Sequence, residues 1–401
     1  MSLEDPNKTF ENSDNSYNEI IYKFEEYYAQ NILYMWTSSE LENIFHYYLY
    51  INKNLRKYEF ALRIARKYYS NEDWLYYYIG KYYQAKHNYP FAIKNFTKFL
   101  YENTSNDFVL YDLSYCWKKL KNYSSPVKNF KKYLKFNPFS ADGWFLLGYH
   151  SIILKKWFQA INAFEMSIAI FPDNPTSYFN LGHIYTELNL YEKSINAYLK
   201  ALEYDSGDIL TIYYLGETYF LDDQFDQAYK CYKECISVDD TFHEAYFSLA
   251  NLYYVKKEYI KAEIFIDKAL SIYKNDAEYY NQKAEIQFAL SKVEDAEENY
   301  LKAIGLDPES LVYLEDYISF LIKEKRYIDA VESFENSKNE KHSDELLFLA
   351  FIAHFYAGKR QQSYILFSEL LEKQYITYTK LEEYPEVLSD EFIFQNLIVN
   401  Q

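Results

Sequence analysis

Glycine, proline and cysteine are scarce in this sequence of 401 residues, which contains 8 Gly, 8 Pro and 3 Cys. Folds with many tight turns need residues that accept a positive φ or that fix φ near the turn value, so an all-β fold is disfavoured. Cys116, Cys231 and Cys235 are too few for a disulfide framework, and a chain of this size needs none. The cysteine content therefore fits a reducing compartment.

Basic residues are outnumbered by acidic ones, 42 Lys and Arg against 59 Asp and Glu, which gives a net charge of −17. Such a field repels phosphate backbones and anionic lipids, so we expect neither a nucleic-acid partner nor a membrane partner. No apolar run reaches the length of a signal peptide or of a membrane-spanning helix, and we expect a cytoplasmic protein. With 49% hydrophobic residues the chain predicts a large buried core.

The charge is distributed unevenly along the chain. Residues 73–140 contain 11 basic and 4 acidic residues, a net +7, whereas residues 276–401 contain 12 basic and 25 acidic residues, a net −13. The basic stretch could dock an acidic segment, although a charge-rich helix face is more often simply solvated.

Three series of residues repeat at an interval of 34 residues. The first is a small residue, at Gly80, Ser114, Gly148, Gly182, Gly216, Ala250 and Ala284. The second, twelve positions later, is mostly small: Ala92, Pro126, Ala160, Ser194, Ala228, Ala262, Ala296 and Ala330. The third, four positions later again, is large: Phe96, Phe130, Phe164, Tyr198, Tyr232, Ile266, Tyr300 and Phe334. Two such series in phase over several units establish an internal repeat.

Each unit is predicted to contain two antiparallel helices, because apolar residues within each half recur three and four residues apart. The small residues mark where the two backbones approach, and the large ones fill the space beside them. Helix starts are indicated by Ser140, by Asn174 before Pro175, and by Asp307 before Pro308.

The residues that carry this period resemble the tetratricopeptide repeat (TPR), for example Trp144 to Gly148, then Ala160 and Phe164. The resemblance covers residues 42 to about 375, and the whole layout is similar to that of cytoplasmic bacterial proteins with many such repeats. It implies an all-α fold, a right-handed α-solenoid of stacked antiparallel helix hairpins with about ten units. We place the units near residues 42, 73, 107, 141, 175, 209, 243, 277, 311 and 344, and the first and last are degenerate.

The segments outside the repeats are given separate roles. Residues 1–15 are expected to form a disordered tail, and residues 16–41 an N-terminal cap helix before a capping box at Ser39–Glu42. Residues 376–401 are predicted to cap the last hairpin, because a solenoid otherwise ends in an exposed apolar face.

The resemblance implies that positions two, five, nine, twelve and thirteen of each repeat face a concave channel. We take ten residues on these first helices as a candidate peptide-binding groove: Tyr77, Tyr111, Phe145, Tyr149, Phe179, Asn180, His183, Tyr213, Phe247 and Asn251. A rigid aromatic offers a large apolar area with few rotamers to freeze, which suits peptide recognition. The alternative is that the position-five aromatics only pack neighbouring helices.

Two specialised binding modes of the family are not predicted. The carboxylate clamp needs Lys and Asn at positions five and nine of one repeat, and no run supplies them: the unit before Asn180 offers Phe145 and Tyr149. The Asn ladder of sugar-transferase relatives at position six is also missing.

Motifs for chemistry are missing as well, since the sequence has no Gly-rich phosphate loop, nucleophile elbow or His-Glu-x-x-His. Cys231, Cys235 and His243 could in principle hold a metal, but they occupy ordinary packing positions with no obvious fourth ligand. We expect no catalytic residues, no metal and no cofactor.

The leading hypothesis is a non-enzymatic adaptor that binds a protein or peptide segment of basic or apolar character. The alternatives are a structural subunit that forms a homo-oligomer through its edge repeats, and an enzyme with an unrecognised site in the channel.

Overall fold

The computed structural model describes residues 15–102, 107–122, 124–337 and 342–399, and every regular element in these ranges is helical. The chain divides into two compact units, Met1–Thr211 and Ile212–Gln401, with the division inside α12. The tail predicted for residues 1–15 lies almost wholly outside the described residues. No described helix combines the length and the apolar character needed to cross a membrane.

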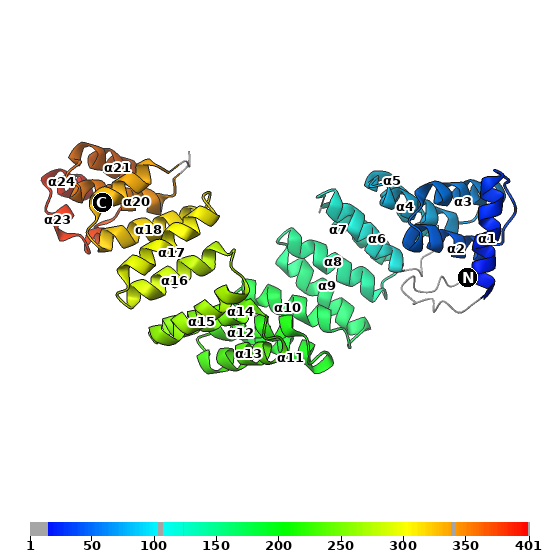
Figure 1. Ribbon diagram of the computed structural model, residues 1–401, viewed down its shortest axis with the longest axis horizontal. Coiled ribbons are helices and arrows are strands. Elements are labelled where there is room, and N and C mark those ends of the chain that lie inside the picture. Colours follow the sequence, from blue (N-terminus) through cyan, green and yellow to red (C-terminus); the bar gives the residue numbers. More distant parts are fainter. Residues whose placement is uncertain (1–14, 103–106, 123, 338–341, 400–401) are drawn as a thin grey trace. The chain divides into compact units, whose positions relative to one another are not determined.

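The N-terminal unit is a succession of helix hairpins (Figure 1). Its elements are α1 (Asn15–Ala29), α2 (Ser38–His46), the π-helical turn η1 (Tyr47–Ile51), α3 (Leu55–Tyr68), α4 (Trp74–Ala85), α5 (Tyr89–Glu102), α6 (Phe108–Lys119), α7 (Ser124–Phe136), α8 (Ala141–Ile153), α9 (Trp157–Ile170), α10 (Pro175–Glu187) and α11 (Tyr191–Tyr204). Helix α4 packs on α5, α8 on α9 and α10 on α11, while α5 contacts α6 and α7 contacts α8. Each hairpin therefore stacks on the next within this unit.

The C-terminal unit repeats the arrangement. Its helices are α12 (Ile209–Leu221), α13 (Phe225–Val238), α14 (His243–Val255), α15 (Tyr259–Ile272), α16 (Ala277–Ala289), α17 (Val293–Leu306), α18 (Leu311–Lys323), α19 (Tyr327–Glu335), α20 (Asp344–Tyr356), α21 (Arg360–Glu372), α22 (Tyr378–Leu381), α23 (Pro385–Leu388) and α24 (Glu391–Val399). The pairs α14 with α15, α16 with α17 and α20 with α21 pack together. The all-α architecture of stacked helix hairpins predicted from the sequence is confirmed.

The hairpins are set by a contact between a small residue on the first helix and a ring on the second. A Cβ added to Gly148 would lie 2.8 Å from the ring of Phe164, and one added to Gly182 would lie 2.7 Å from the ring of Tyr198. These distances are too short for a carbon–carbon contact, so only glycine lets the two helices approach this closely. The predicted pairing of small with large residues is thus confirmed at these positions.

The turn inside each hairpin holds one residue at positive φ, which sequence reasoning missed. These residues again recur every 34 positions: His87, Lys121, Lys155, Asn189, Asp223, Lys257, Ser291 and Lys325. At Asn189 the φ is 57°, and the following N–H, of Leu190, donates to the Tyr185 carbonyl at 2.8 Å. This is the hydrogen-bond pattern that closes a helix with a left-handed residue. In these eight turns the position holds a polar residue rather than glycine, so the usual glycine signal is missing there; the turn between α20 and α21 has Gly358 instead.

Two helix starts agree with the prediction and one does not. Ser140 and Asn174 cap α8 and α10 by accepting from the N–H groups of Gly143 and Ser177. Asp307, which the sequence predicts as the start of the next helix, is instead the C-terminal cap of α17, and α18 begins at Leu311.

The N-terminal cap also differs from the prediction of one helix over residues 16–41. Helix α1 ends at Ala29, and α2 starts at Ser38 behind a capping box formed by Thr37 and Glu40, not at Ser39–Glu42. The Thr37 side chain accepts from the Glu40 N–H at 3.2 Å, and the Glu40 carboxylate accepts from the Thr37 N–H at 2.8 Å. A Thr and a Glu three residues apart satisfy two free N–H groups at once, and this breaks the segment into two helices.

The C-terminal segment contributes buried side chains to the core of its unit. Ile376, Leu381, Val387, Ile393 and Leu397 are buried in one cluster with residues of α18 and α20. The capping role predicted for residues 376–401 is consistent with this burial.

We expect Gly148→Ala to lower the free energy of unfolding by about 1–3 kcal/mol, because the added methyl group would collide with the fully buried ring of Phe164. The matched control is Gly305→Ala on the exposed side of α17, where a Cβ meets no atom within 4 Å. That change should stabilise the protein by up to about 1 kcal/mol through helix propensity alone. Urea unfolding followed by circular dichroism measures both, and a Gly148→Ala protein as stable as the wild type would contradict the tight contact.

Candidate functional site

The first helices of the N-terminal unit enclose a hollow of about 780 Å³. Three tyrosines on its wall are exposed, Tyr50 by 43%, Tyr111 by 46% and Tyr115 by 44%. Tyr111 and Tyr115 lie four residues apart and so share one face of α6. The lining residues are Leu49, Tyr50, Lys81, Gln84, Ala85, His87, Phe108, Tyr111, Asp112, Tyr115 and Asp142.

A largely buried ion pair lies in this hollow. Lys81 Nζ is 2.9 Å from an Asp112 carboxylate oxygen, with side chains exposed by only 12% and 17%. The Gln84 amide also donates to Asp112, at 3.1 Å. Burial disfavours the charged lysine, but the neighbouring Tyr77 and Asp112 outweigh it and raise the pKa of Lys81. The two charges compensate each other, and the rings of Tyr50, Phe108, Tyr111 and Tyr115 line the hollow beside them.

Among the position-five aromatics, Tyr77 is buried among other rings. Tyr77 is only 5% exposed and contacts the rings of Phe96, Phe99 and Phe108. Its assignment to a ligand-binding surface is therefore wrong, because a side chain enclosed by these rings belongs to the core.

The other aromatics of the series are less enclosed. Phe145, Phe179, Tyr213 and Phe247 are half-buried, and each lies against another ring: Phe164, Tyr198, Phe242 and Tyr279, respectively. Tyr111 is the exposed member, and its hydroxyl donates to Asp142 at 2.9 Å. Contact with a ligand stays a prediction for these five residues.

The remaining predicted groove residues lie in different surroundings. Tyr149 and His183 are half-buried on α8 and α10. The side-chain amide of Asn180 donates to the Thr176 carbonyl of its own helix at 2.7 Å. Asn251, on α14, has a buried side-chain oxygen for which the described residues offer no donor.

Three polar side chains lie together in the C-terminal unit: Asn281, Glu285 and Asp316. We call them the Glu285 cluster. Asn281 and Glu285 lie four residues apart on α16, and α16 contacts α18, which carries Asp316. The Asn281 side-chain amide donates to Asp316 at 2.7 Å. No ion pair found among the described residues involves Glu285 or Asp316.

The pKa values of both carboxyl groups in the Glu285 cluster are raised, and burial is the main cause for each. Burial, and then the charge of Asp316, raise the pKa of Glu285 to about 7, against the opposing effect of Lys323. The pKa of Asp316 is also raised by burial, although the hydrogen bond from Asn281 acts in the other direction. Near neutral pH the negative charges of these carboxyl groups are therefore only partly stabilised by the surrounding side chains.

Three buried side-chain atoms on α14 and α16 have no hydrogen-bond partner within the described chain. They are the amide oxygens of Asn251 and Asn281 and the amide nitrogen of Gln282, judged against the part of the chain that the structure describes. A buried polar atom left without a hydrogen bond costs about 1–3 kcal/mol, so native proteins rarely keep one without a reason.

The sequence showed that residues 276–401 are strongly acidic, but it did not identify the Glu285 cluster. Glu285 and Asp316 are 31 residues apart and come together only because successive first helices stack. The available signal was positional, since Glu285 is at position nine of its repeat and Asp316 at position six of the next.

The three cysteines are buried thiols with no disulfide. Burial raises the pKa of Cys231 and Cys235 to about 12, so neither is a thiolate at neutral pH. His243 stacks on Tyr273 at 4.7 Å, and its Nδ1 lies 2.8 Å from the Tyr279 hydroxyl. Within the described ranges, no three His, Cys, Asp or Glu side chains are placed to hold a metal ion.

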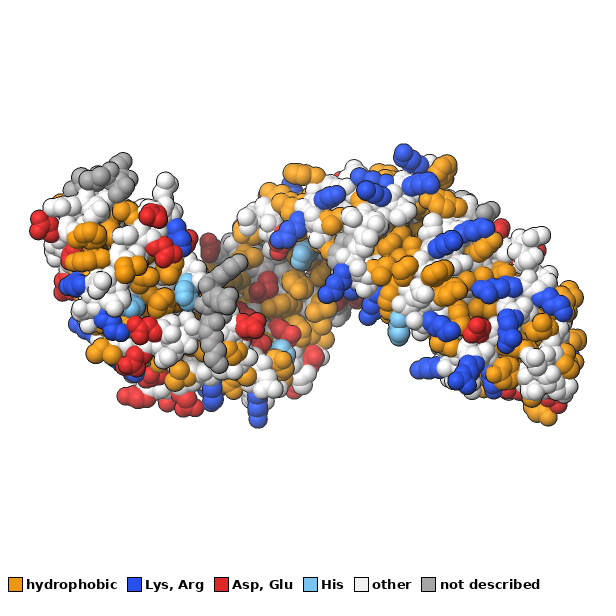
Figure 2. All heavy atoms as spheres, turned by 90° about the horizontal axis from the view of Figure 1, so that it is seen from above, with side chains coloured by type: hydrophobic (Ala, Val, Ile, Leu, Met, Phe, Trp, Pro, Cys, Tyr) orange, Lys and Arg blue, Asp and Glu red, His pale blue; other side chains and the backbone are white. Residues whose placement is uncertain are grey.

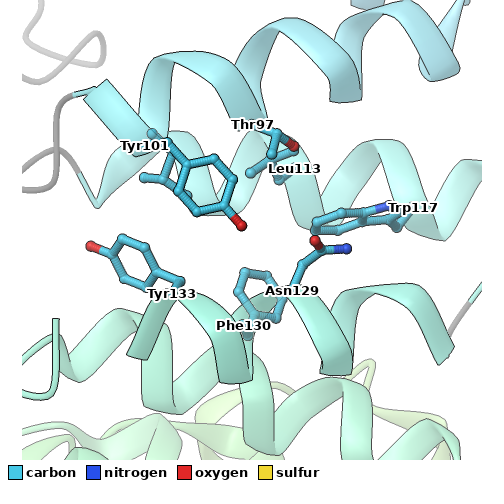
Figure 3. Close-up of a pocket in the computed structure, with 8 residues that line it drawn as sticks. Thr97, Tyr101, Leu113, Trp117, Asn129, Phe130 and Tyr133 are labelled. Carbon is cyan, nitrogen blue, oxygen red and sulfur yellow. The ribbon is translucent and has the colours of Figure 1, made fainter. Parts of the chain in front are cut away.

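A second cavity lies between α5, α6 and α7 (Figure 3) and is too small for a ligand. The side chains of Tyr101, Trp117, Asn129 and Tyr133 surround it, and its volume is about 10 Å³. That is barely enough for one water molecule, so we regard it as a packing gap.

Comparison with known proteins agrees with the fold. The sequence profile of the Tetratricopeptide repeat family matches residues 175–208, 211–242, 243–276 and 277–310. A search of curated proteins found no match.

Several solved structures are similar to parts of the chain. A tetratricopeptide repeat protein from Parabacteroides merdae ATCC 43184 has 18% identity and a TM-score of 0.52, and the match covers 62% of this chain and 98% of that one. PilW, a type IV pilus biogenesis factor, has 20% identity and a TM-score of 0.48 over 54% of this chain and 98% of its own. A thermophilic TPR protein of Thermus thermophilus has 20% identity and a TM-score of 0.39 over 46% and 100% of the two chains. At these identities the likeness concerns the fold alone.

We expect Glu285→Gln to stabilise the protein at pH 8 by about 1–3 kcal/mol and much less at pH 5. In the folded state the pKa of Glu285 is raised from 4.5 to about 7. The folded protein therefore binds more protons than the unfolded chain in this window, and stability falls as the pH rises from 4.5 through 7. The Gln side chain does not ionise, so the variant does not lose this stability as the pH rises. Urea unfolding at both pH values measures it, and an equal effect at pH 5 and pH 8 would contradict the raised pKa.

Proposed function

We propose that this chain, a tetratricopeptide repeat protein, is a non-enzymatic scaffold that binds a protein segment on the faces of its first helices. Its repeats support a role in protein–protein interaction in general, because stacked hairpins expose long binding surfaces. The groove and the nature of the segment are the specific parts of this proposal.

The observation that carries the proposal is the aromatic hollow of the N-terminal unit. A volume of about 780 Å³ is within the range of ligand sites, and three exposed tyrosines on its wall provide apolar area together with hydroxyl groups. Tyrosine is favoured at protein interfaces because it immobilises few rotamers on binding. Lys81 and Asp112 compensate each other's charge and Asp142 accepts a hydrogen bond from Tyr111, so the tyrosine rings are left to contact an apolar or aromatic part of a partner.

A cytoplasmic location and the lack of enzymatic activity belong to the same proposal. Three buried thiols without a disulfide fit a reducing compartment. The hollow brings together tyrosines, one lysine, two aspartates and His87, and the lysine is already paired with Asp112. We propose no enzymatic activity there because the sequence carries none of the short motifs that place a nucleophile, a phosphate or a metal.

Self-association is a second candidate, favoured by the charge distribution. Residues 73–140 have a net charge of +7 and residues 276–401 a net charge of −13. On the face seen in Figure 2, many Lys and Arg side chains lie over the N-terminal unit and many Asp and Glu side chains over the C-terminal unit. Two copies pairing through these stretches of opposite charge would separate as salt is added. Light scattering at low and high salt separates the candidates, because a monomer at both salt concentrations removes this one.

We expect the double variant Tyr111→Ser, Tyr115→Ser to weaken the binding of selected peptides roughly thirtyfold, since loss of buried aromatic anchors costs about 2 kcal/mol. The test selects peptides from a displayed random library on the purified wild-type protein and then measures each affinity by fluorescence anisotropy. Both tyrosines are exposed, so the fold should be kept, which circular dichroism checks.

The matched control is Phe158→Ser on α9, an aromatic that is 84% exposed and lies outside the hollow. Its peptide affinities should equal those of the wild type. If the library yields no binding peptide, or if the double variant binds as well as the control, the hollow is not the binding surface and the proposal fails.

A further inference from the structure

We propose that the Glu285 cluster is a subsite for a guanidinium or ammonium group, the side chain of an Arg or Lys in the bound segment. This inference rests on the proposed function for the source of that side chain. The subsite itself, however, can be tested without any partner.

The argument begins with a contact that recurs between neighbouring repeats. A residue at position nine of one first helix meets a residue at position six of the next. In the N-terminal unit this contact is the ion pair between Lys81 and Asp112, at 2.9 Å. In the C-terminal unit it is first a hydrogen bond from the Ser248 hydroxyl to Glu217, at 2.7 Å.

The same two positions hold Glu285 and Asp316 in the Glu285 cluster, and here both side chains are acidic. Where Lys81 supplies a cation to Asp112, Glu285 adds a second carboxylate beside Asp316. The Glu285 cluster therefore has a carboxylate at the repeat position where the ion pair has Lys81. A cation from outside the chain would complete it.

The charges around the cluster do not complete it. Lys323 on α18 is the basic group that acts on both carboxyl groups, and it is exposed and pairs with neither. The other titratable groups facing Glu285 are Tyr254 on α14 and Tyr300 on α17, and both of these are neutral. An organic cation from a bound segment is the occupant that follows from the proposed binding of a protein segment.

Asn281 gives independent support for a ligand. Its side chain is only 9% exposed, its amide nitrogen is held by Asp316, and its amide oxygen has no donor within the described residues. The hydrogen bond to Asp316 ties this amide to the cluster, and its oxygen adds a buried acceptor to those of the two carboxyl groups. Three acceptor groups in one cluster match the several N–H donors of a guanidinium or an ammonium group.

Two further atoms indicate how the main chain of such a segment could be held. The Gln282 amide nitrogen is a donor without an acceptor, and the Asn251 oxygen is an acceptor without a donor, as far as the described residues go. They lie on α16 and α14, which contact each other. One donor and one acceptor are what an extended peptide needs for its own carbonyl and N–H groups.

The test measures binding of N-acetylarginine methylamide to the full chain, with the citrulline compound as its uncharged isostere. Saturation-transfer NMR detects weak binding of both. We expect the arginine compound to bind at least tenfold more tightly than the citrulline compound, and Glu285→Gln or Asp316→Asn to remove the difference. The matched control is Glu309→Gln, which makes the same charge change at an exposed residue outside the cluster.

A charge-reversal variant makes the test more specific. Glu285→Lys should pair with Asp316 as Lys81 pairs with Asp112, so it should fold normally and no longer bind the arginine compound. Equal binding of the two compounds to the wild type, no binding of either, or unchanged binding after Glu285→Gln each overturns the inference.

The outcome separates this inference from the proposed function. The variant Tyr111→Ser, Tyr115→Ser alters the other unit and should bind the arginine compound like the wild type. Loss of arginine binding in Glu285→Gln together with no effect of the tyrosine variant on peptides would leave the subsite standing and reject the hollow. The reverse result would keep the hollow and reject the subsite.

Discussion

The close contact between a small residue on the first helix and a large residue on the second sets the approach of the two helices in a hairpin. At Gly148 and Gly182 the ring of the second helix occupies the space that a Cβ would need. This fixes how the second helix lies on the first, and the left-handed residue in the turn fixes the chain direction between them. Because the same contact recurs every 34 residues, a given repeat position faces the same surroundings in successive hairpins.

In such a scaffold the contact between two repeat positions is kept while the residues that make it differ from repeat to repeat. The meeting of position nine with position six of the next repeat is a charged pair at Lys81 and Asp112, and a neutral hydroxyl on a carboxylate at Ser248 and Glu217. At Glu285 and Asp316 the same meeting brings two acids together. Changing one residue in a repeat therefore changes the charge of one point on the surface and leaves the hairpins in place. Different points of one chain can in this way recognise different groups of a partner.

The helix pattern was predictable from the sequence because it depends on local spacing. The 34-residue period, the small and large series and the caps at Ser140 and Asn174 each require only neighbouring residues. The candidate site was less predictable. The repeat position of Tyr77 predicts which side of its helix the side chain lies on. It does not predict that the side chain is buried, because the burial comes from Phe99 and Phe108, which lie on other helices. The Thr37 capping box was missed because two overlapping Ser/Thr signals compete there.

A cost in stability at the Glu285 cluster is what a binding site of this kind requires. Two half-buried acids without a counter-charge destabilise the free protein, and a cation bound between them would relieve that repulsion, so binding and stability are linked. The same cation would favour the charged form of Glu285, whose pKa lies near 7, so its binding should release protons at neutral pH. A closed pair such as Lys81 with Asp112 gains nothing from an added cation. The Glu285 cluster, whose carboxyl groups have no ion pair among the described residues, is thus stabilised more by a bound cation than the pair of Lys81 and Asp112 would be.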